Sequence, residues 1–195
     1  MKPISISVLT ICGLQDLELH TRSGVTHVLS ILDPDWPDPE AFLAYEPHHR
    51  TILHFHDAIE PGPNITLPEI GHVEAVLAFG RSLSFDAARR LDGHLLIHCH
   101  MGISRSTAAM AALLAQIYPD EDEGRLFERL LRIRPQAWPN SRMVGFADQL
   151  LGRGGRLTSG LGKLYRHQLA RHPQLADAMR RIGRGREVEM AGQAE

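Results

Sequence analysis

The segment from His98 to Thr107 places a cysteine, a glycine and an arginine at regular spacing, since Cys99, Gly102 and Arg105 follow one another at intervals of three. The segment comes after a short apolar run typical of a buried strand and opens a stretch typical of a helix. Such a turn can point several backbone N–H groups at one place, and the helix N-terminus adds a positive field. We therefore expect an anion site, whose field also stabilises the nucleophilic thiolate form of a cysteine.

Three neighbouring residues fit that chemistry. Gly102 allows the backbone to turn and to approach a ligand closely. Arg105 presents a planar guanidinium that can bind two oxygens of one phosphate. Ser106 could donate a hydrogen bond to the sulfur of Cys99 and make that sulfur a better leaving group. If Cys99 were only a small buried hydrophobic residue, the positions of Gly102 and Arg105 would be coincidences.

Residues His98 to Ser106 match, at every defined position, the signature His-Cys-(five residues)-Arg-Ser/Thr of the cysteine-dependent protein phosphatases. The stretch from Arg134 to Asn140, with Phe146 and Gln149-Leu150 behind it, is similar to the Arg-Pro … Pro-Asn … Phe … Gln-Leu stretch of dual-specificity phosphatases. The chain thus resembles this family from about Ile4 to Leu151, and most of all its small bacterial tyrosine-phosphatase-like members.

The resemblance implies a mechanism that needs no metal or other cofactor. Cys99 would attack phosphorus and form a cysteinyl-phosphate, while Arg105 and the N–H groups of the loop bind the negative charge of the transition state. Water would then hydrolyse the intermediate. His98 would support the loop through hydrogen bonds. The residues assigned to phosphate binding are His100, Met101, Gly102, Ile103, Ser104 and Arg105.

The implied partner is a phosphorylated protein or peptide. Phosphotyrosine is the expected substrate, and phosphoserine and phosphothreonine remain open. No lysine lies between Cys99 and Arg105, which weakens a phosphoinositide substrate. The tyrosine-bearing recognition loop of large receptor-like tyrosine phosphatases is also missing, so we expect a shallower site. A non-catalytic phosphopeptide-binding module and a rhodanese-like sulfur transferase are the alternative functions.

Two segments could supply a general acid. Trp36-Pro37-Asp38 spells the acid-bearing tripeptide of large tyrosine phosphatases, but Asp38 lies 61 residues before Cys99 with another strand still to come. In the family that the chain resembles, the acid follows that next strand, which here ends at Asp57. We therefore expect Asp57 to protonate the leaving oxygen. Glu60 and Asp38 stay open as alternatives, and Asp38 is otherwise a turn residue among prolines.

Two further side-chain pairs carry weaker hypotheses. His54 and His56 share a face of one strand and could chelate a metal ion, but the other ligands of a closed site are not evident. We therefore expect packed or solvated histidines. Cys12 could form a reversible disulfide with Cys99, as second cysteines do in some members of the family, or be an inert strand residue.

Apolar runs rich in β-branched residues predict strands at Ile4–Cys12, His27–Leu32, Arg50–His56 and Leu95–His98. The first run alternates, which suggests an edge strand, whereas the second and fourth are continuous, as in strands buried on both faces. Helices are expected after the Thr66–Glu69 capping box, across Met110–Ile117, from Glu123 to before Pro135, and after Pro139. This order predicts an α/β fold with a central, mainly parallel sheet flanked by helices.

The composition of the sequence changes near residue 152, where glycine and basic residues become more frequent. We expect a phosphatase-like domain over residues 1–152 and a basic helical extension with a flexible tail over residues 153–195. Five glycines between Gly152 and Gly162 suggest a hinge, because glycine disfavours helix interiors. A helix near Lys163–Arg181 and a frayed Gly-Arg end would follow. This end has nine Lys/Arg against four Asp/Glu, and it is either solvated or in contact with an acidic partner.

Composition excludes several classes of protein. The 195 residues contain 21 Lys/Arg against 23 Asp/Glu, so the basic surface of a nucleic-acid-binding protein is not expected. No apolar run reaches the length that spans a bilayer. Two cysteines do not make a disulfide framework, which favours a reducing compartment. We expect a cytoplasmic protein whose first residues form a strand, with a weak signal peptide as the alternative.

Overall fold

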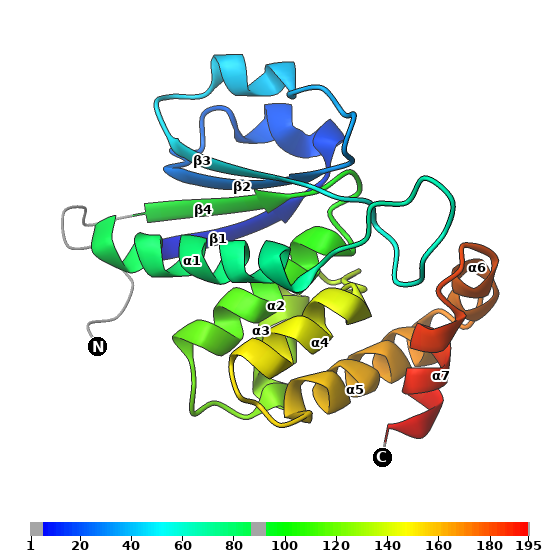
Figure 1. Ribbon diagram of the computed structural model, residues 1–195. Helices are drawn as coiled ribbons and strands as arrows, with labels where there is room; N and C mark the ends of the chain where they lie inside the picture. The colour runs from blue at the N-terminus through cyan, green and yellow to red at the C-terminus, as the bar shows by residue number, and fades with distance from the viewer. Residues whose placement is uncertain (1–5, 87–92, 195) are drawn as a thin grey trace.

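The computed structural model describes residues 6–86 and 93–194, and its centre is a four-stranded parallel sheet (Figure 1). Its strands are β1 (Ile6–Cys12), β2 (His27–Leu32), β3 (His49–His54) and β4 (Gly93–His98). They lie in the order β1-β4-β2-β3, and every neighbouring pair is parallel. The four strands expected from the sequence are therefore present, and the sheet is parallel as expected. Ile4 and Ser5 lie outside the described residues.

The position of each strand follows its hydrophobic pattern. Every residue of β2 and β4 is buried, and these two strands occupy the centre of the sheet. Strands β1 and β3 form the edges, and β3 has exposed side chains at several positions. The expectation that the alternating first strand is an edge strand is confirmed, as is burial of the continuous runs on both faces.

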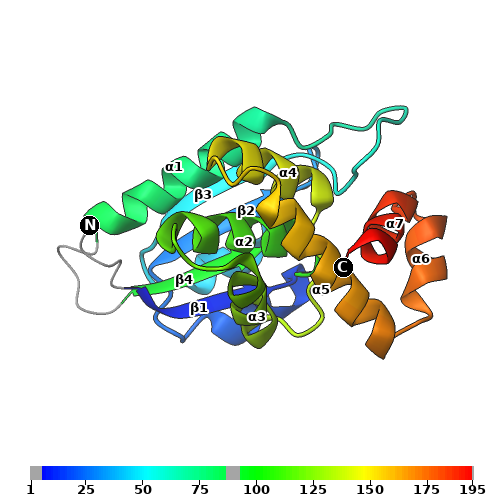
Figure 2. The same ribbon diagram turned by 90° about the horizontal axis from the view of Figure 1, so that it is seen from below.

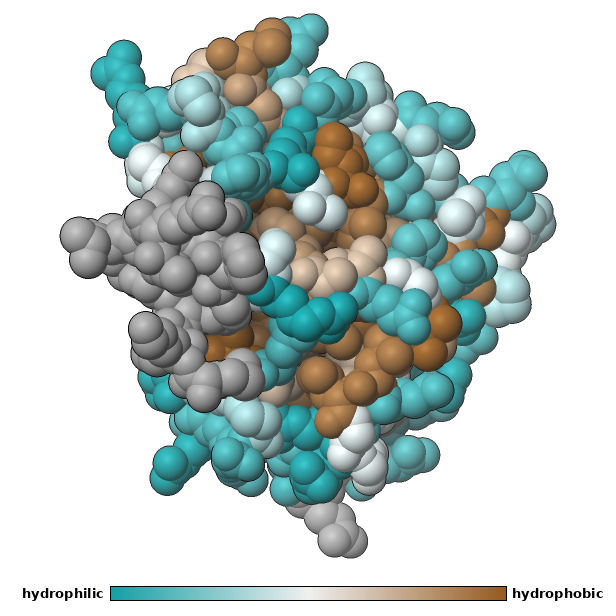
Figure 3. All heavy atoms as spheres, turned by 60° about the vertical axis from the view of Figure 1, so that its left-hand side comes forward, coloured by the Kyte–Doolittle hydropathy of each residue, from teal (hydrophilic) through white to brown (hydrophobic). Residues whose placement is uncertain are grey.

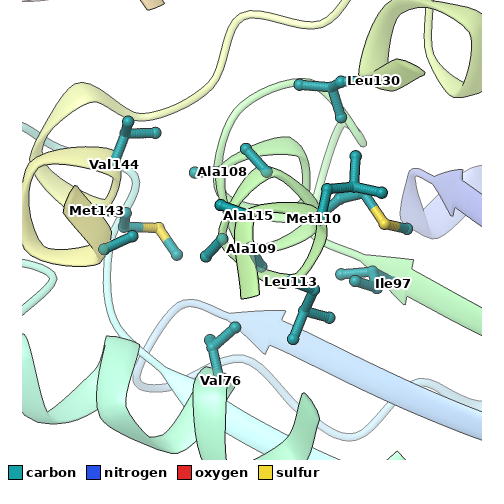
Figure 4. Close-up of a cluster of buried hydrophobic side chains, with 14 of the residues drawn as sticks. Val76, Ile97, Ala108, Ala109, Met110, Leu113, Ala115, Leu130, Met143 and Val144 are labelled. Carbon is teal, nitrogen blue, oxygen red and sulfur yellow. The ribbon is translucent and has the colours of Figure 1, made fainter. Parts of the chain in front are cut away.

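Different kinds of helix cover the two faces of the sheet (Figure 1). Helices α1 (Ile70–Asp86), α2 (Arg105–Ile117), α3 (Glu123–Ile133) and α4 (Ser141–Leu150) gather on one face. The other face is covered by two short 3-10 helices, η1 (Leu14–His20) and η2 (Glu40–Ala44), through Leu17 and Phe42. Helix α2 is buried from Arg105 to Ala115. Figure 4 shows its Ala108, Ala109, Met110, Leu113 and Ala115 among Ile97 of β4, Val76 of α1, Leu130 of α3, and Met143 and Val144 of α4.

Helix α1 begins at Ile70, three residues later than the capping box with Thr66 as N-cap predicts. Thr66 is used elsewhere, because its N–H donates to Nδ1 of His56 and its carbonyl accepts from the N–H of His56, at 3.0 and 2.8 Å. Glu69 precedes the helix instead, and its N–H donates to Nδ1 of His72. The predicted capping box is therefore wrong, and Thr66 closes the loop that follows β3.

The C-terminal region is helical to its end. Helices α5 (Arg156–Arg171), α6 (Leu175–Arg181) and α7 (Gly185–Gln193) follow one another, and Figure 2 shows α6 and α7 beside the end of α5. The prediction of a frayed Gly-Arg end is wrong: Val188 and Ala191 on α7 are buried. Their burial explains why this segment forms a helix despite its composition, since packing of an apolar face outweighs intrinsic propensity.

The prediction that glycine excludes a helix near residue 160 is also wrong. A Cβ atom on Gly160 would lie 3.0 Å from the ring of Phe127, and one on Gly162 would lie 3.0 Å from the carbonyl oxygen of Met190. These glycines therefore let α5 pack closely against α3 and α7. The turn before α5 is also fixed, because Asp148 accepts hydrogen bonds from the N–H groups of Gly155 and Thr158. It is not a free hinge.

Two observations concern the surface. Figure 3 turns the left-hand side of Figure 1 forward, and hydrophobic residues gather in the middle of that face with hydrophilic residues around them. Among the described helices, none has the length and apolar character needed to cross a bilayer.

Candidate active site

The loop from Cys99 to Ser104 joins β4 to α2 and turns its carbonyl groups outward. Four of these carbonyls accept hydrogen bonds from outside the loop: His100 from Leu14 N–H, Met101 and Gly102 from the Arg134 guanidinium, and Ile103 from Trp138 N–H. The N–H groups of residues 100–104 donate to none of the described residues. These donors therefore remain available for an anion, as the predicted anion site, a nest of backbone N–H groups, requires.

Gly102 is required at its position for two reasons. Its φ is +66°, a left-handed conformation that residues with a Cβ rarely adopt. A Cβ atom there would also lie 2.4 Å from the carbonyl carbon of Cys12. The end of β1 thus packs directly behind the loop, and only glycine leaves room for both backbones.

Cys99 lies at the base of this loop with 2% of its surface exposed. Its sulfur is 3.2 Å from Oγ of Ser106, within hydrogen-bond distance. The preceding residue, His98, is fully buried and faces β2, where its Nε2 is 2.7 Å from Oγ of Ser30. Burial, and secondarily the charge of Arg50, lower the pKa of His98 to about 3. The neutral His98 ring therefore braces the strand that carries Cys99 and is not placed to act as a base.

Arg105 begins α2, and its guanidinium is 2% exposed. Its Nη1 donates to Oδ1 of Asp33 at 2.7 Å and to the carbonyl oxygen of Phe55 at 2.5 Å. Nε is buried and has no hydrogen-bond partner among the described residues. Two contacts thus hold one edge of the guanidinium, while the Nε–Nη2 edge keeps its donors for a ligand. Two parallel donors on one edge are what a bidentate contact with a phosphate would require.

Asp57 lies just beyond β3 and faces the same loop. Its Oδ1 accepts hydrogen bonds from Ser104 Oγ at 2.7 Å, Asn140 Nδ2 at 3.0 Å and Arg184 Nη1 at 3.3 Å. Oδ2 takes part in none of the hydrogen bonds made by residues 6–86 and 93–194, so this oxygen is the one that could carry a proton toward a substrate. The side chain is 31% exposed.

The two alternative acids lie elsewhere. Asp38 forms an ion pair with Arg50 at 2.6 Å and is 64% exposed. Glu60 forms an ion pair with Arg186 at 3.6 Å. Neither residue lines the cavity that contains Cys99, whereas Asp57 does. The geometry therefore favours Asp57 over these two alternatives.

Asp33 is a second carboxylate in this cavity, and the sequence did not single it out. It follows β2 directly and forms the 2.7 Å ion pair with Arg105. Its backbone N–H donates to Nε2 of His100 at 3.3 Å. Burial, and secondarily the charge of Arg105, lower the pKa of His100, so its imidazole is the neutral acceptor that this bond requires. Asp33 thus orients Arg105 and His100.

The segment from Arg134 to Asn140 contacts both the Cys99–Ser104 loop and Asp57. Arg134 binds the carbonyls of Met101 and Gly102, and Asn140 caps α4 through Oδ1 while its Nδ2 reaches Asp57. The sequence marked this segment only through its resemblance to phosphatases. In the structure Arg134 contacts the loop and Asn140 contacts Asp57. No local pattern in the sequence indicates these two contacts.

Arg184, from the loop between α6 and α7, also reaches the site. Its Nη1 donates to Ser104 Oγ at 2.7 Å, and its other nitrogens bind both oxygens of Glu187 at 2.8 Å. Burial alone would lower the pKa of Arg184, but Asp57 and Glu187 raise it above its ordinary value, so the side chain is charged. This contact was not predicted, because it joins the C-terminal region to residues 80 and 127 positions earlier.

These groups surround one cavity of about 460 Å³ at the carboxyl ends of the strands. Its polar lining includes Cys99, Arg105, Asp57 and Asp33. Exposed apolar side chains lie around it on three separate segments: Ile65, Met101 and Ile182. The sequence predicts a shallow site, whereas here Met179 and Ile182 of the C-terminal region add a wall.

The structure also bears on the possible metal site at His54 and His56 and on the thiols of Cys12 and Cys99. His56 lines the cavity, and its Nδ1 accepts the N–H of Thr66. Within residues 6–86 and 93–194 there is no group of three or more His, Cys, Asp and Glu side chains that could hold a metal ion. Cys12 and Cys99 are both free thiols, and burial, with Asp16 second, raises the pKa of Cys12 to about 12.

No protein-family model matches the sequence, and no curated protein matches it either. Solved structures do match. Human DUSP28 has a TM-score of 0.54 and 20% identity, over 74% of this chain and 94% of its own. The human tyrosine phosphatase-like serine/threonine/tyrosine-interacting protein has a TM-score of 0.55 and 18% identity, and the match covers 77% of this chain and 95% of that protein's chain. The Cydia pomonella PTP-2 phosphatase has a TM-score of 0.55 and 17% identity, and the match covers 74% of this chain and 86% of the phosphatase chain. The chain therefore has the fold of the dual-specificity and tyrosine phosphatases.

Proposed function

We propose that this protein is a cysteine-dependent phosphatase that hydrolyses phosphotyrosine in proteins or peptides. The observation that carries the proposal is the arrangement at the end of β4. The sulfur of Cys99 lies at the base of a loop whose N–H groups donate to none of the described residues, in the cavity that also holds Arg105, whose Nε has no partner among them. Phosphotyrosine is the main substrate of the proposal, with phosphoserine and phosphothreonine as further substrates of the same chemistry.

Each step of the reaction has a residue in place. The Cys99 thiolate attacks phosphorus, the bond to the tyrosine oxygen breaks, and Asp57 gives that oxygen a proton. Arg105 and the N–H groups of residues 100–104 bind the phosphoryl oxygens as charge develops. Water, deprotonated by Asp57, then attacks the cysteinyl-phosphate and releases inorganic phosphate. Ser106 stabilises the departing thiolate through the 3.2 Å contact.

A non-catalytic phosphopeptide-binding module is the second candidate, because the same nest and the same Arg105 edge would bind phosphate without turnover. One of the similar structures is named as an interacting protein. A rhodanese-like sulfur transferase has less support, since it has no use for a carboxyl group held over the loop as Asp57 is. We also propose the cytoplasm as compartment, because the mechanism needs Cys99 as a free thiol.

Turnover of p-nitrophenyl phosphate by the wild-type protein tests the proposal. We expect release of p-nitrophenol, and release of phosphate from a phosphotyrosine peptide. Binding of that peptide without any turnover would contradict the enzyme and support the binding module. Sulfur transfer from thiosulfate to cyanide, without phosphate release, would support the sulfur transferase instead.

Asp57→Asn is expected to slow hydrolysis of an aryl phosphate with a poor leaving group by about 10²-fold, at the low end of the usual range for a general acid. The effect is modest because Asp57 is partly exposed and water can protonate the leaving oxygen in its place. The decline of the rate at alkaline pH, which reports a protonated acid, should also disappear. A good leaving group should restore much of the rate, because it departs without a proton.

Asp38→Asn is the matched control for this change, because Asp38 is an exposed carboxylate outside the cavity. We expect its pH profile to follow the wild type. If Asp38→Asn removed the alkaline decline while Asp57→Asn left it in place, the assignment of the acid would be wrong.

Ser106→Ala is expected to slow the second step more than the first, because the hydroxyl lies against the sulfur that must depart. Rapid mixing with p-nitrophenyl phosphate should then show a burst of p-nitrophenol of about one equivalent, followed by a slower steady state. Unchanged steady-state turnover with no burst would remove this role from Ser106.

A further inference from the structure

We propose that helix α6 and the turn that follows it, anchored by α7, form a recognition wall of the active site, which selects phosphate esters of aromatic rings over those of serine and threonine. The inference rests on the proposed phosphate site and adds its substrate class. It starts from the cavity that holds Cys99, to which the C-terminal region contributes Met179, Ile182 and Arg184.

The wall is fixed to the catalytic loop by buried polar contacts. Arg184 binds Ser104 and Asp57, and Glu187 accepts hydrogen bonds from Trp138 Nε1 at 2.5 Å and from Ser141 N–H at 2.9 Å. Arg184 and Glu187 are 4% and 0% exposed, and they bind each other through two hydrogen bonds. Removing either Arg184 or Glu187 would leave the other as a buried charge without its partner, which is strongly unfavourable. The pair therefore holds the wall in place.

A chain turn connects this anchor to the apolar side chains of the wall. The N–H of Arg184 donates to the carbonyl oxygen of Met179 at 2.8 Å, which closes the end of α6. Ile182 lies within this turn and is 66% exposed, although it lines the cavity. The anchor therefore sets the position of an isoleucine that is not itself buried by the fold.

Two other exposed apolar side chains face the same cavity from different parts of the chain. Ile65 is 38% exposed in the loop that follows β3, and Met101 is 66% exposed in the phosphate-binding loop. Apolar side chains from three segments thus surround a charged floor. An exposed apolar cluster around a polar site is typical of a binding surface rather than of chance exposure.

The shape of this site distinguishes the two kinds of ester. In phosphotyrosine an aromatic ring separates the phosphate from the peptide backbone, so the ring can lie between the walls while phosphorus reaches Cys99. The sulfur atoms of Met101 and Met179 also make favourable contacts with aromatic rings. In phosphoserine a single methylene carries the phosphate, and it offers the walls little apolar surface. The wall should therefore favour the aryl ester.

Peptide binding to Cys99→Ser protein tests the wall independently of turnover. Two peptides of the same sequence are compared, one with phosphotyrosine and one with phosphoserine, by fluorescence anisotropy. We expect tighter binding of the phosphotyrosine peptide. Adding Ile182→Ala should weaken it roughly tenfold, because the alanine removes most of the apolar contact, and should bring the two Kd values closer together.

Leu43→Ala is the matched control, because Leu43 is an even more exposed apolar residue on η2, outside the cavity. We expect no change in either Kd. Met179→Ala provides a second probe of the wall, and the melting temperature is measured for every variant, so that a general loss of structure is recognised.

The outcomes separate the wall from the phosphatase proposal. Equal affinity for the two peptides, or equal weakening of both by Ile182→Ala, would overturn the wall even if the wild type hydrolyses p-nitrophenyl phosphate. A wild-type protein without turnover that still prefers phosphotyrosine, and loses this preference in Ile182→Ala, would overturn the catalytic proposal and support the wall.

Discussion

Cys99→Ser is expected to abolish turnover of p-nitrophenyl phosphate, with a loss on the order of 10⁴-fold or more, as when an enzyme loses its nucleophile. The substitution changes one buried atom and keeps a donor and an acceptor beside Ser106. A serine hydroxyl ionises far less readily than a cysteine thiol, so no strong nucleophile remains. The nest and Arg105 are untouched, so inorganic phosphate should still bind.

Cys12→Ala is the matched control for the loss of a thiol. Cys12 is the other buried cysteine, and burial, with Asp16 second, raises its pKa to about 12, so its thiol stays protonated. Turnover should stay within a few-fold of wild type in this variant. Steady-state rates and melting temperatures of both proteins are compared. Substantial turnover in Cys99→Ser would show that another group attacks phosphorus.

The fold was largely predictable because its elements have strong local patterns. Strands β2 and β4 are continuous apolar runs, and helices α2 to α4 have apolar residues at helical spacing between prolines. The start of α1 was not predictable. Thr66 is of a residue type common at helix N-caps, but its N–H donates to His56, ten residues earlier in the sequence. A local signal could not reveal this competing partner.

The centre of the candidate site was predictable for a related reason. Cys99, Gly102, Arg105 and Ser106 belong to one continuous segment, so their spacing in the sequence already determines their spacing in space. Asp33 and Arg184 reach the same cavity from distant segments, and only tertiary packing brings them there.

The C-terminal region shows the limit of composition as a guide. Glycine-rich and basic sequence predicts a hinge and a loose end, because glycine and repelling charges oppose helix formation. Here Gly160 and Gly162 give α5 close contact with its neighbours, and Arg184 is neutralised by Glu187 and Asp57. The unfavourable effects of glycine and of positive charge on helix formation are each offset by residues far away in the sequence. Composition alone gives no information about such contacts.

Arg105→Lys is expected to lower kcat/KM for aryl phosphates by about 10³-fold or more. Loss of one donor to a developing oxyanion typically costs 10² to 10³ in rate, and this change removes the two donors of the Nε–Nη2 edge. A lysine would keep the positive charge but concentrate it on one nitrogen, which Asp33 and the carbonyl of Phe55 are placed to bind. The charge would then face these groups and not the phosphoryl oxygens.

Arg129→Lys is the control for this substitution, because Arg129 pairs with Glu121 outside the catalytic cavity. Steady-state kinetics and the inhibition constant of inorganic phosphate are measured for both variants. We expect weaker inhibition by phosphate in Arg105→Lys together with the loss of rate, because the same edge binds the ground state and the transition state. Near-normal turnover in Arg105→Lys would mean that charge alone suffices at this position. The partnerless Nε would then not be a phosphate contact, and the ion pair with Asp33 would be the main task of Arg105.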